Sequence, residues 1–421
     1  MRSARKKARR NRRARTRRAG TCWRNLQDNS FAVKIIMTPL AADDSRPIIF
    51  ICAGDPSAEN HAAGVASLLK EGGLAVSSAG GEKLKNLSDI FVGDTISLET
   101  FGFAVSPRAA LGILKVYRAV ERHLDERRPS AVLLVDFFGF NAKVGAAAAR
   151  RGIPVYYYIP PQIWATRYGR IKAIKSFVKK VFTTLPFESE IYAREGIPFE
   201  QVGHPLLETT PSGVESRRAG LPPLVGFFPG SRTHIVRRHV DIINAVAANL
   251  NDIRGAGKTE FALFGLSALK DSYRRLASGI NLILDAGSRG VAAAGPSAAV
   301  SVSGTIATEL ALMKIPTAIF YNVSALNAFI LRSMIKIRTK YVSLPNILLD
   351  EELQPEFLQE KALGGDIAVR VAGFIDGEPR DTAESFARVR RLLEPADASG
   401  RVASSIINDI LGASSDGRSN Q

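Results

Sequence analysis

The sequence is poor in cysteine and has no long apolar run. Its two cysteines, Cys22 and Cys52, stand in an arginine-rich tail and in a predicted buried strand. We therefore expect neither a structural disulfide nor a cysteine-held metal site, as is usual in a reducing cytoplasm. No stretch of about 18 apolar residues lacks a charge, so we predict no transmembrane helix and only peripheral contact with a membrane.

Metal-binding patterns are also missing. No group of His, Cys and carboxylate residues has the spacing of metal ligands, and no Asp-x-Asp pair occurs where a nucleotide would bind. We expect chemistry without a metal ion and without any other cofactor.

Positive charge is concentrated at the beginning of the chain. Of the formal net charge of +17, residues 1–37 account for +12, because they hold 13 Lys and Arg against the single acid Asp28. A segment this polar cannot offset its ordering entropy, so we expect residues 1–46 to be a disordered tail. Three interpretations stay open: a start assigned too early, with Met37 as the first residue, a tail held on anionic lipid or RNA, or a targeting peptide. No apolar segment follows, which excludes a secretory signal.

The rest of the chain is predicted to form two domains. Its 421 residues, 46% of them hydrophobic, are enough for two cores. From Pro47, short apolar strands alternate with helices, which is typical of parallel sheets covered on both faces. We predict an α/β fold with two doubly wound, Rossmann-like domains facing a cleft, at residues 47–207 and 208–385, then a C-terminal helix and frayed tail at 386–421. Ligands of such sheets bind beyond the carboxyl ends of the strands, so the cleft is the expected active site.

The predicted elements fall into two series. The first has strands at 48–52, 75–78, 131–135, 155–159 and 180–184, with helices at about 58–71, 107–126 and 141–151. After a linker at 205–223, the second has strands at 224–228, 260–264, 281–284 and 298–302, with helices from about 234 and from 305.

Two turns of the second series suit an anionic ligand. In residues 229–232, a glycine allows close approach, Ser231 offers a hydroxyl and Arg232 offers a fork for a phosphate. A solvated basic helix face is the alternative for the arginines that follow at 237 and 238.

The second such turn is Ser303-Gly304-Thr305, at a strand end where a helix begins. Its amides and hydroxyls suit a diphosphate, and Glu309 stands one helical turn further on, where sugar hydroxyls would lie. A capping box with Thr305 as N-cap is the alternative, and both roles are compatible.

The first series offers a candidate base. Asp136 closes an apolar strand beside three aromatic residues, where desolvation raises the pKa of a carboxyl group and makes it a better base. A turn or cap residue is the alternative. In the loop at 53–60, Gly54 and Ser57 suit contact of the backbone with a ligand, although a plain turn explains them equally. Other candidates for substrate contact are Gln162, Trp164 and His204, the last of which also suits a hinge.

A series of motifs follows the order of a known family. They are residues 156–165, then Arg170 and Lys172, 185–192, 202–206, 229–232, 303–305 with Glu309, 341–348 and 355–359. Together, between about Pro47 and Gln359, they resemble the lipid-A-disaccharide synthases, which are inverting glycosyltransferases with the two-domain fold called GT-B. The stretch 341–348 is the most specific.

The resemblance implies roles for individual residues. Asp136 falls on the family's proposed general base and Arg232 on its essential arginine. The UDP-sugar site would comprise Ser231, Ser303, Gly304, Thr305, Glu309 and Asn346. The implied reaction transfers 2,3-diacylglucosamine from UDP to 2,3-diacylglucosamine 1-phosphate (lipid X), forming a β-1,6 disaccharide in lipid A biosynthesis. It would take place on the cytoplasmic face of the inner membrane. No specific nucleic-acid partner is expected, and the oligomeric state is not indicated.

The chain also departs from the family's motifs. Ala58, Glu59, Gly139 and Ile235 replace a glycine and three acids, and the segment 101–105 lacks the usual glutamate. These changes bear on substrate range and turnover. Retention of Asp136 and Arg232 argues against an inactive enzyme.

Contact with lipid and two rival functions remain open at this point. Ile113, Tyr117, Val120 and Leu124 share one face of a predicted helix, opposite Lys115, Arg118 and Arg122, which suits either a membrane surface or packing on the sheet. The rivals are another GT-B enzyme acting on a soluble UDP-sugar and a nucleic-acid-binding protein that uses the basic tail.

Overall fold

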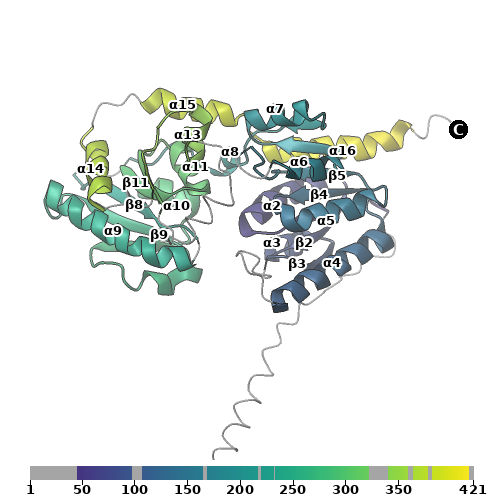
Figure 1. Cartoon of the computed structure of the whole chain (residues 1–421), viewed down its shortest axis with the longest axis horizontal. Coiled ribbons are helices and arrows are strands. Elements are labelled where there is room, and N and C mark those ends of the chain that lie inside the picture. Colours follow the sequence, from purple (N-terminus) through teal and green to yellow (C-terminus); the bar gives the residue numbers. More distant parts are fainter. Residues whose placement is uncertain are drawn as a thin grey trace, which may run out of the picture.

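The computed structural model shows two parallel sheets side by side, each flanked by helices (Figure 1). This confirms the predicted fold class. The structure describes residues 45–96, 107–164, 168–216, 220–231, 233–321, 340–358, 364–377 and 382–416. Nearly all of the predicted basic tail therefore lies outside the described residues.

The first sheet has seven strands in the order β3-β2-β1-β4-β5-β6-β7, with every neighbouring pair parallel. The strands are β1 (Ile48–Ala53), β2 (Ala75–Gly80), β3 (Ile90–Asp94), β4 (Ala131–Val135), β5 (Val155–Tyr158), β6 (Lys180–Thr183) and β7 (Phe199–Gln201). The helices between them are α2 (Pro56–Glu71), α3 (Glu82–Leu87), α4 (Pro107–Arg127), α5 (Phe138–Ala149), α6 (Arg170–Lys175) and α7 (Pro186–Arg194).

The second sheet has six parallel strands in the order β10-β9-β8-β11-β12-β13. They are β8 (Leu224–Phe228), β9 (Glu260–Gly265), β10 (Ile280–Leu284), β11 (Ala298–Val302), β12 (Thr317–Tyr321) and β13 (Glu356–Leu358). The accompanying helices are α8 (Leu206–Thr209), α9 (Thr233–Arg254), η1 (Ser267–Tyr273), α10 (Gly287–Ala294), α11 (Thr305–Leu312), α13 (Leu344–Leu349) and α14 (Gly364–Ile375).

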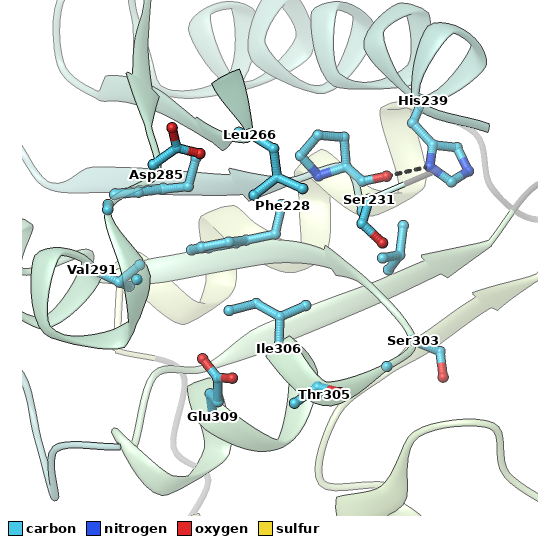
Figure 2. Close-up of a pocket in the computed structure, with 18 of the residues that line it drawn as sticks. Phe228, Ser231, His239, Leu266, Asp285, Val291, Ser303, Thr305, Ile306 and Glu309 are labelled. Carbon is cyan, nitrogen blue, oxygen red and sulfur yellow. Dashed lines mark hydrogen bonds between the residues drawn. The ribbon is translucent and has the colours of Figure 1, made fainter. Parts of the chain in front are cut away.

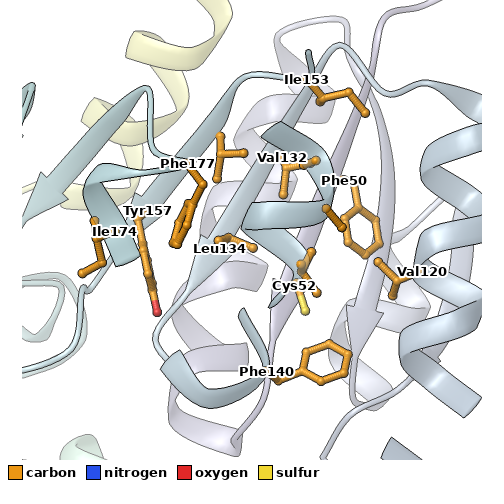
Figure 3. Close-up of a cluster of buried hydrophobic side chains, with 14 of the residues drawn as sticks. Phe50, Cys52, Val120, Val132, Leu134, Phe140, Ile153, Tyr157, Ile174 and Phe177 are labelled. Carbon is orange, nitrogen blue, oxygen red and sulfur yellow. The ribbon is translucent and has the colours of Figure 1, made fainter. Parts of the chain in front are cut away.

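Alternate residues of a buried strand supply two separate cores. On β1, Phe50 and Cys52 join a cluster on one face of the first sheet, and Ile49 and Ile51 join a cluster on the other. Figure 3 shows the first of these clusters, to which α4, α5 and α6 contribute Val120, Phe140 and Ile174. Because both faces are covered, the strand is apolar at every position, which is why the sequence pattern predicts it so well.

Helix α4 packs on the first sheet through the face that was a candidate for lipid contact. Val120 and Leu124 are fully buried, and Ile113 and Tyr117 pack against the same core cluster. The membrane interpretation of this face is therefore wrong, because the sheet already covers it. Among the described residues, no helix is long and apolar enough to cross a membrane.

The end of the chain returns to the first domain. Helix α15 (Thr382–Leu393) is followed by α16 (Ala398–Asp416), which packs against α2 (Figure 1). Val402 and Ile406 are fully buried in the same cluster as Ile49. Two helices thus lie where the sequence predicted one, and the predicted domain boundaries at 207 and 385 stay predictions.

The sequence analysis did not predict four of the strands, which are β3, β7, β12 and β13. Strands β7 and β13 are three-residue edge strands with partly exposed positions, and β3 is a short strand containing a glycine. Strand β12 carries a clear signal, because five apolar or β-branched residues follow a proline, and it could have been predicted.

Candidate functional site

The two sheets share one topological feature. In each, the chain order reverses between two central neighbours, β1 and β4 in the first sheet and β8 and β11 in the second. Ligands of doubly wound sheets bind at the carboxyl ends of the strands on either side of such a reversal. Ala53 pairs with Val135, and Phe228 pairs with Ser301. The turns that follow these four strands contain most of the predicted site residues.

The second sheet has a pocket at its reversal point. Its volume is about 490 Å³, and all of its lining residues come from the second domain (Figure 2). It brings together five residues predicted for the UDP-sugar site: Ser231, Ser303, Gly304, Thr305 and Glu309.

One end of the pocket lies at the start of a helix. Gly304 is the N-cap of α11, so the alternative in which Thr305 caps this helix is wrong. The φ angle of Gly304 is 153°, a conformation that side chains rarely permit. Ser303 donates a hydrogen bond from Oγ to the carbonyl oxygen of Val342 at 2.6 Å, which fixes the turn. The unpaired amides of a helix start in this position suit an anionic group such as a diphosphate.

The other end of the pocket is aromatic and partly apolar. The rings of Phe228 and Phe264 stack with centroids 4.9 Å apart. Asp285, in the left-handed region at φ 53°, accepts a hydrogen bond from the amide of Ser267 at 3.0 Å, and Leu266 is 41% exposed beside it. Figure 2 shows Asp285 and Ser303 toward opposite ends of the pocket. A planar base fits the apolar end while a diphosphate lies at the helix start.

The carboxylate of Glu309 lies along the pocket and is held by a neighbour. Ser288 on α10 donates a hydrogen bond from Oγ to Oε2 of Glu309 at 2.7 Å. Burial raises the pKa of Glu309, and the bond from Ser288 opposes that shift. A carboxylate held in this way is suited to accept hydrogen bonds from sugar hydroxyls.

A buried histidine supports the floor of the pocket. The Nδ1 of His239 lies 2.9 Å from the carbonyl oxygen of Pro229 and donates to it, since that oxygen only accepts (Figure 2). The ring packs edge-on against Phe320, with centroids 4.7 Å apart. His239 therefore anchors the turn that contains Ser231. Arg232 lies outside the described residues, and Arg237 and Arg238 are exposed on α9.

The carboxyl group of Asp136 stands at the reversal point of the first sheet and does not line the pocket of the second. Asp136 has a φ angle of 46° and Phe137 one of 45°, both left-handed. The carbonyl oxygen of Asp136 accepts hydrogen bonds from Asn141 Nδ2 at 2.8 Å and from the Tyr157 hydroxyl at 2.9 Å. These bonds hold a backbone conformation that would otherwise cost about 1 kcal/mol or more.

The surroundings of Asp136 make it a stronger base than a solvated aspartate. Burial, and then the negative charge of Asp55, raise its pKa to about 6, while the guanidinium of Arg170 opposes them. The residue is half-buried, so it is shielded from water without being enclosed. Such a group is ionised at neutral pH and still has a high affinity for a proton.

The first loop contains both predicted and unpredicted residues. Gly54 is buried, and Ser57 is exposed in the first turn of α2. Asp55, which was not among the predicted site residues, is the N-cap of α2 and accepts a hydrogen bond from the amide of Ala58 at 2.9 Å. An aspartate before a proline at the first helical position is a helix-start signal. That signal predicts that Asp55 caps the helix, but it does not predict that Asp55 lies near Asp136.

Four further candidates make structural contacts or lie away from the pocket. Trp164 donates a hydrogen bond to Glu188 at 3.2 Å, and His204 Nδ1 accepts one from the amide of Leu206 at 3.3 Å. Asn346 is fully buried and donates to the carbonyl oxygen of Gln354 at 2.7 Å and to Glu356 at 2.9 Å. Gln162 is exposed. Their predicted contacts with substrate stay predictions.

The family model and the sequence relatives agree on one family. The family model described as lipid-A-disaccharide synthetase matches residues 49–399. A lipid-A-disaccharide synthase of Geobacter metallireducens is 31% identical over 379 residues, which cover 86% of this chain and 97% of that protein. One from Syntrophus aciditrophicus is 32% identical over 347 residues, covering 79% of this chain and 89% of that protein.

Solved structures show a similar arrangement of domains. The glycotransferase of kitacinnamycin superposes with a TM-score of 0.58 at 12% identity, covering 86% of this chain and 98% of the other. The UDP-GlcNAc 2-epimerase of Methanocaldococcus jannaschii, solved with UDP-GlcNAc and UDP, gives a TM-score of 0.53 at 11% identity and covers 85% and 99%. These likenesses show the two-domain GT-B fold.

Proposed function

Because this chain belongs to the lipid-A-disaccharide synthase family, we propose that it transfers 2,3-diacylglucosamine from UDP to lipid X, giving a β-1,6-linked disaccharide and UDP. It is a glycosyltransferase. The observation that carries the proposal is the pocket in which Ser231, the turn from Ser303 to Thr305 and Glu309 meet at the reversal point of the second sheet.

The donor occupies this pocket in the proposed complex. The uracil ring lies at the end with Phe264 and Asp285, and the diphosphate lies against the start of α11. Negative charge grows on the diphosphate as the sugar departs, and amides already fixed in place stabilise it without reorganisation. We propose that Arg232 adds a positive charge at the same end and that no metal ion is required.

The acceptor binds at the reversal point of the first sheet, where Asp136 acts as the general base. As the acceptor's 6-hydroxyl attacks the anomeric carbon, its O–H bond breaks and the proton moves to the carboxylate of Asp136. The bond from that carbon to the diphosphate breaks, and its electron pair leaves with UDP. Attack from the face opposite UDP inverts the anomeric centre. The raised pKa of Asp136 suits this role.

Acylated substrates require access to a lipid surface. Beside its buried face, α4 has an exposed apolar surface that suits contact with lipid. Leu111 is 61% exposed and Leu114 is 42% exposed, and the exposed Lys115 and Arg118 follow on the same helix. Apolar side chains rimmed by cations are typical of surfaces that lie on anionic membranes. We propose that this part of α4 contacts the cytoplasmic face of the inner membrane.

One assay tests the function. Purified protein is incubated with UDP-2,3-diacylglucosamine and lipid X in the presence of a chelator, and UDP and disaccharide are measured. We expect both products in equal amounts, and a fall in turnover rate of about 100-fold or more for Asp136→Asn.

The same assay distinguishes the rival functions. Equal turnover of UDP-sugars without acyl chains would favour the enzyme that acts on a soluble UDP-sugar. Deletion of residues 1–36 should leave the activity intact, whereas a nucleic-acid-binding protein would lose its salt-sensitive binding.

A further inference from the structure

We propose that Asp55 is a positioning residue for Asp136, and that the two carboxyl groups form a pair that shares one proton and sets the pH at which the base becomes active. This inference rests on the proposed function, in which Asp136 takes the proton of the acceptor hydroxyl. It concerns a residue that neither the motifs nor the pocket of the second sheet assigns to the reaction.

The sheet topology brings the two residues together. Strands β1 and β4 are neighbours, and their last residues, Ala53 and Val135, pair directly. Asp136 follows β4 at once, and Asp55 follows β1 after one glycine. The two side chains are close enough that the charge of Asp55, and a hydrogen bond between the two carboxyl groups, raise the pKa of Asp136. Ionised carboxylates only accept hydrogen bonds, so such a contact requires a proton on one of them.

The two members of the pair have different surroundings. Asp55 is the N-cap of the 16-residue helix α2, and its Oδ1 accepts a hydrogen bond from the amide of Ala58 at 2.9 Å. A helix start stabilises negative charge. Asp136 is instead followed by Phe137 and Phe138. Burial raises the pKa of its carboxyl group to about 6. The shared proton therefore belongs mainly to Asp136.

Other charged and titratable groups also face the pair from the described elements around it. Arg170 of α6 attracts negative charge on Asp136, and its guanidinium lies 4.7 Å from the ring centre of Phe138. Tyr157 of β5 donates its hydroxyl to the backbone carbonyl of Asp136, so it does not compete for the carboxyl group. Burial lowers the pKa of His61, which faces Asp55, to about 4. Next to it, burial lowers the pKa of His204 to about 3. Both histidines are therefore neutral at neutral pH.

The pairing has a direct consequence for catalysis. Without the negative charge of Asp55, the carboxylate of Asp136 would hold its proton less tightly and would be a weaker base. With it, Asp136 loses its proton just below neutral pH and recovers one readily from the acceptor. When the acceptor's proton arrives, it resides on Asp136.

The dependence of kcat/KM on pH tests the inference. Asp55→Asn and Asp55→Ser both keep an oxygen that can cap α2, so the fold should be retained, while the charge is removed. We expect the acidic limb of the profile to move to lower pH by about one unit in both variants, and the rate at the plateau to fall several-fold. In Asp55→Glu, which keeps the charge, the limb should stay closer to that of the wild type.

The outcomes separate the two levels of the proposal. An acidic limb that does not move in Asp55→Asn and Asp55→Ser would overturn the role of Asp55 and leave Asp136 as the base. An undiminished rate in Asp136→Asn would instead overturn the base itself. Circular dichroism and thermal unfolding of each variant show whether α2 and the domain are intact. If Asp55→Ser unfolds, the comparison of Asp55→Asn with Asp55→Glu still decides.

Discussion

The ring of Phe137 occupies the space that any side chain at Gly54 would need. A Cβ atom on Gly54 would lie 1.9 Å from that ring, far inside contact distance. Because Phe137 follows Asp136, and both have left-handed backbone angles, the close contact links the loop after β1 to the geometry of the base. Glycine at position 54 is therefore needed for packing.

Replacing Gly54 with alanine should disturb the base without touching substrate. We expect Gly54→Ala to displace Phe137, lower kcat at least tenfold and reduce stability by about 1–3 kcal/mol, since inserted atoms force neighbours out of place. Gly139→Ala is the matched control, because that residue is exposed on α5 and an added methyl group would meet no atom within 4 Å. It should unfold at or above the wild-type temperature. Equal kcat values for wild type and Gly54→Ala would refute the link.

Removing the hydroxyl that holds Glu309 should weaken donor binding. Ser288→Ala abolishes the 2.7 Å hydrogen bond to Glu309, and a bond of this kind contributes about 1 kcal/mol. We expect KM for the UDP-sugar to rise up to about tenfold while kcat changes less. The effect should grow at lower pH, because the pKa of Glu309 rises further without Ser288. Ser297→Ala, at an exposed position before β11, should match the wild type.

Charges on the exposed end of α4 should release the protein from membranes. Leu111→Glu combined with Leu114→Glu should reduce sedimentation with vesicles of phosphatidylethanolamine and phosphatidylglycerol at least tenfold, because burial of each leucine contributes about 1 kcal/mol or more. Leu411→Glu, at a leucine 39% exposed on α16, is the control and should sediment as the wild type does. Unchanged sedimentation of the double variant would exclude this surface.

Buried Glu188 should make stability fall as pH rises. Burial raises its pKa from 4.5 to about 7, although Thr184, Leu185 and Trp164 donate hydrogen bonds that oppose the shift. The folded state thus binds the proton more tightly than the unfolded chain. Its stabilising effect is complete below pH 4.5 and is lost by about pH 7. The free energy of unfolding should fall by roughly 2 kcal/mol across this range.

Urea unfolding at several pH values isolates that contribution. Glu188→Gln should flatten the pH slope, whereas Glu190→Gln, at an exposed position on the same helix α7, should keep it. A slope shared by all three proteins would show that Glu188 does not titrate in this range.

The sequence predicted the most central strands of each sheet well, but it missed the interior strand β12 and three of the four edge strands, β3, β7 and β13. Strands β4, β8 and β11 are buried at every position, so their apolar runs marked them to the residue. Strand β7 has no buried position, and its three residues carry too little pattern to detect. Turns that follow central strands could be predicted as ligand-binding sites, because predicting the strand also places the turn at its carboxyl end.

Relationships across the sheet could not be predicted in this way. Asp55 and Asp136 lie close together only because β1 pairs with β4, although β2 and β3 separate these strands in the sequence. Phe264 and Asp285 line the pocket for a similar reason, as they stand at the ends of β9 and β10. Asn346 matched a family motif, but a motif does not reveal that its amide is already bonded to Gln354 and Glu356.

Helix α16 has a consequence for how the molecule is made. The first sheet is synthesised early, yet one of its faces is covered by Val402 and Ile406, which leave the ribosome only after the entire second domain. Until then the nascent chain must carry an open apolar surface beside α2, and domains that emerge early usually fold first. Completion of the first domain is thereby tied to the synthesis of α16, and a chaperone that binds apolar segments would find its binding surface on that uncovered face.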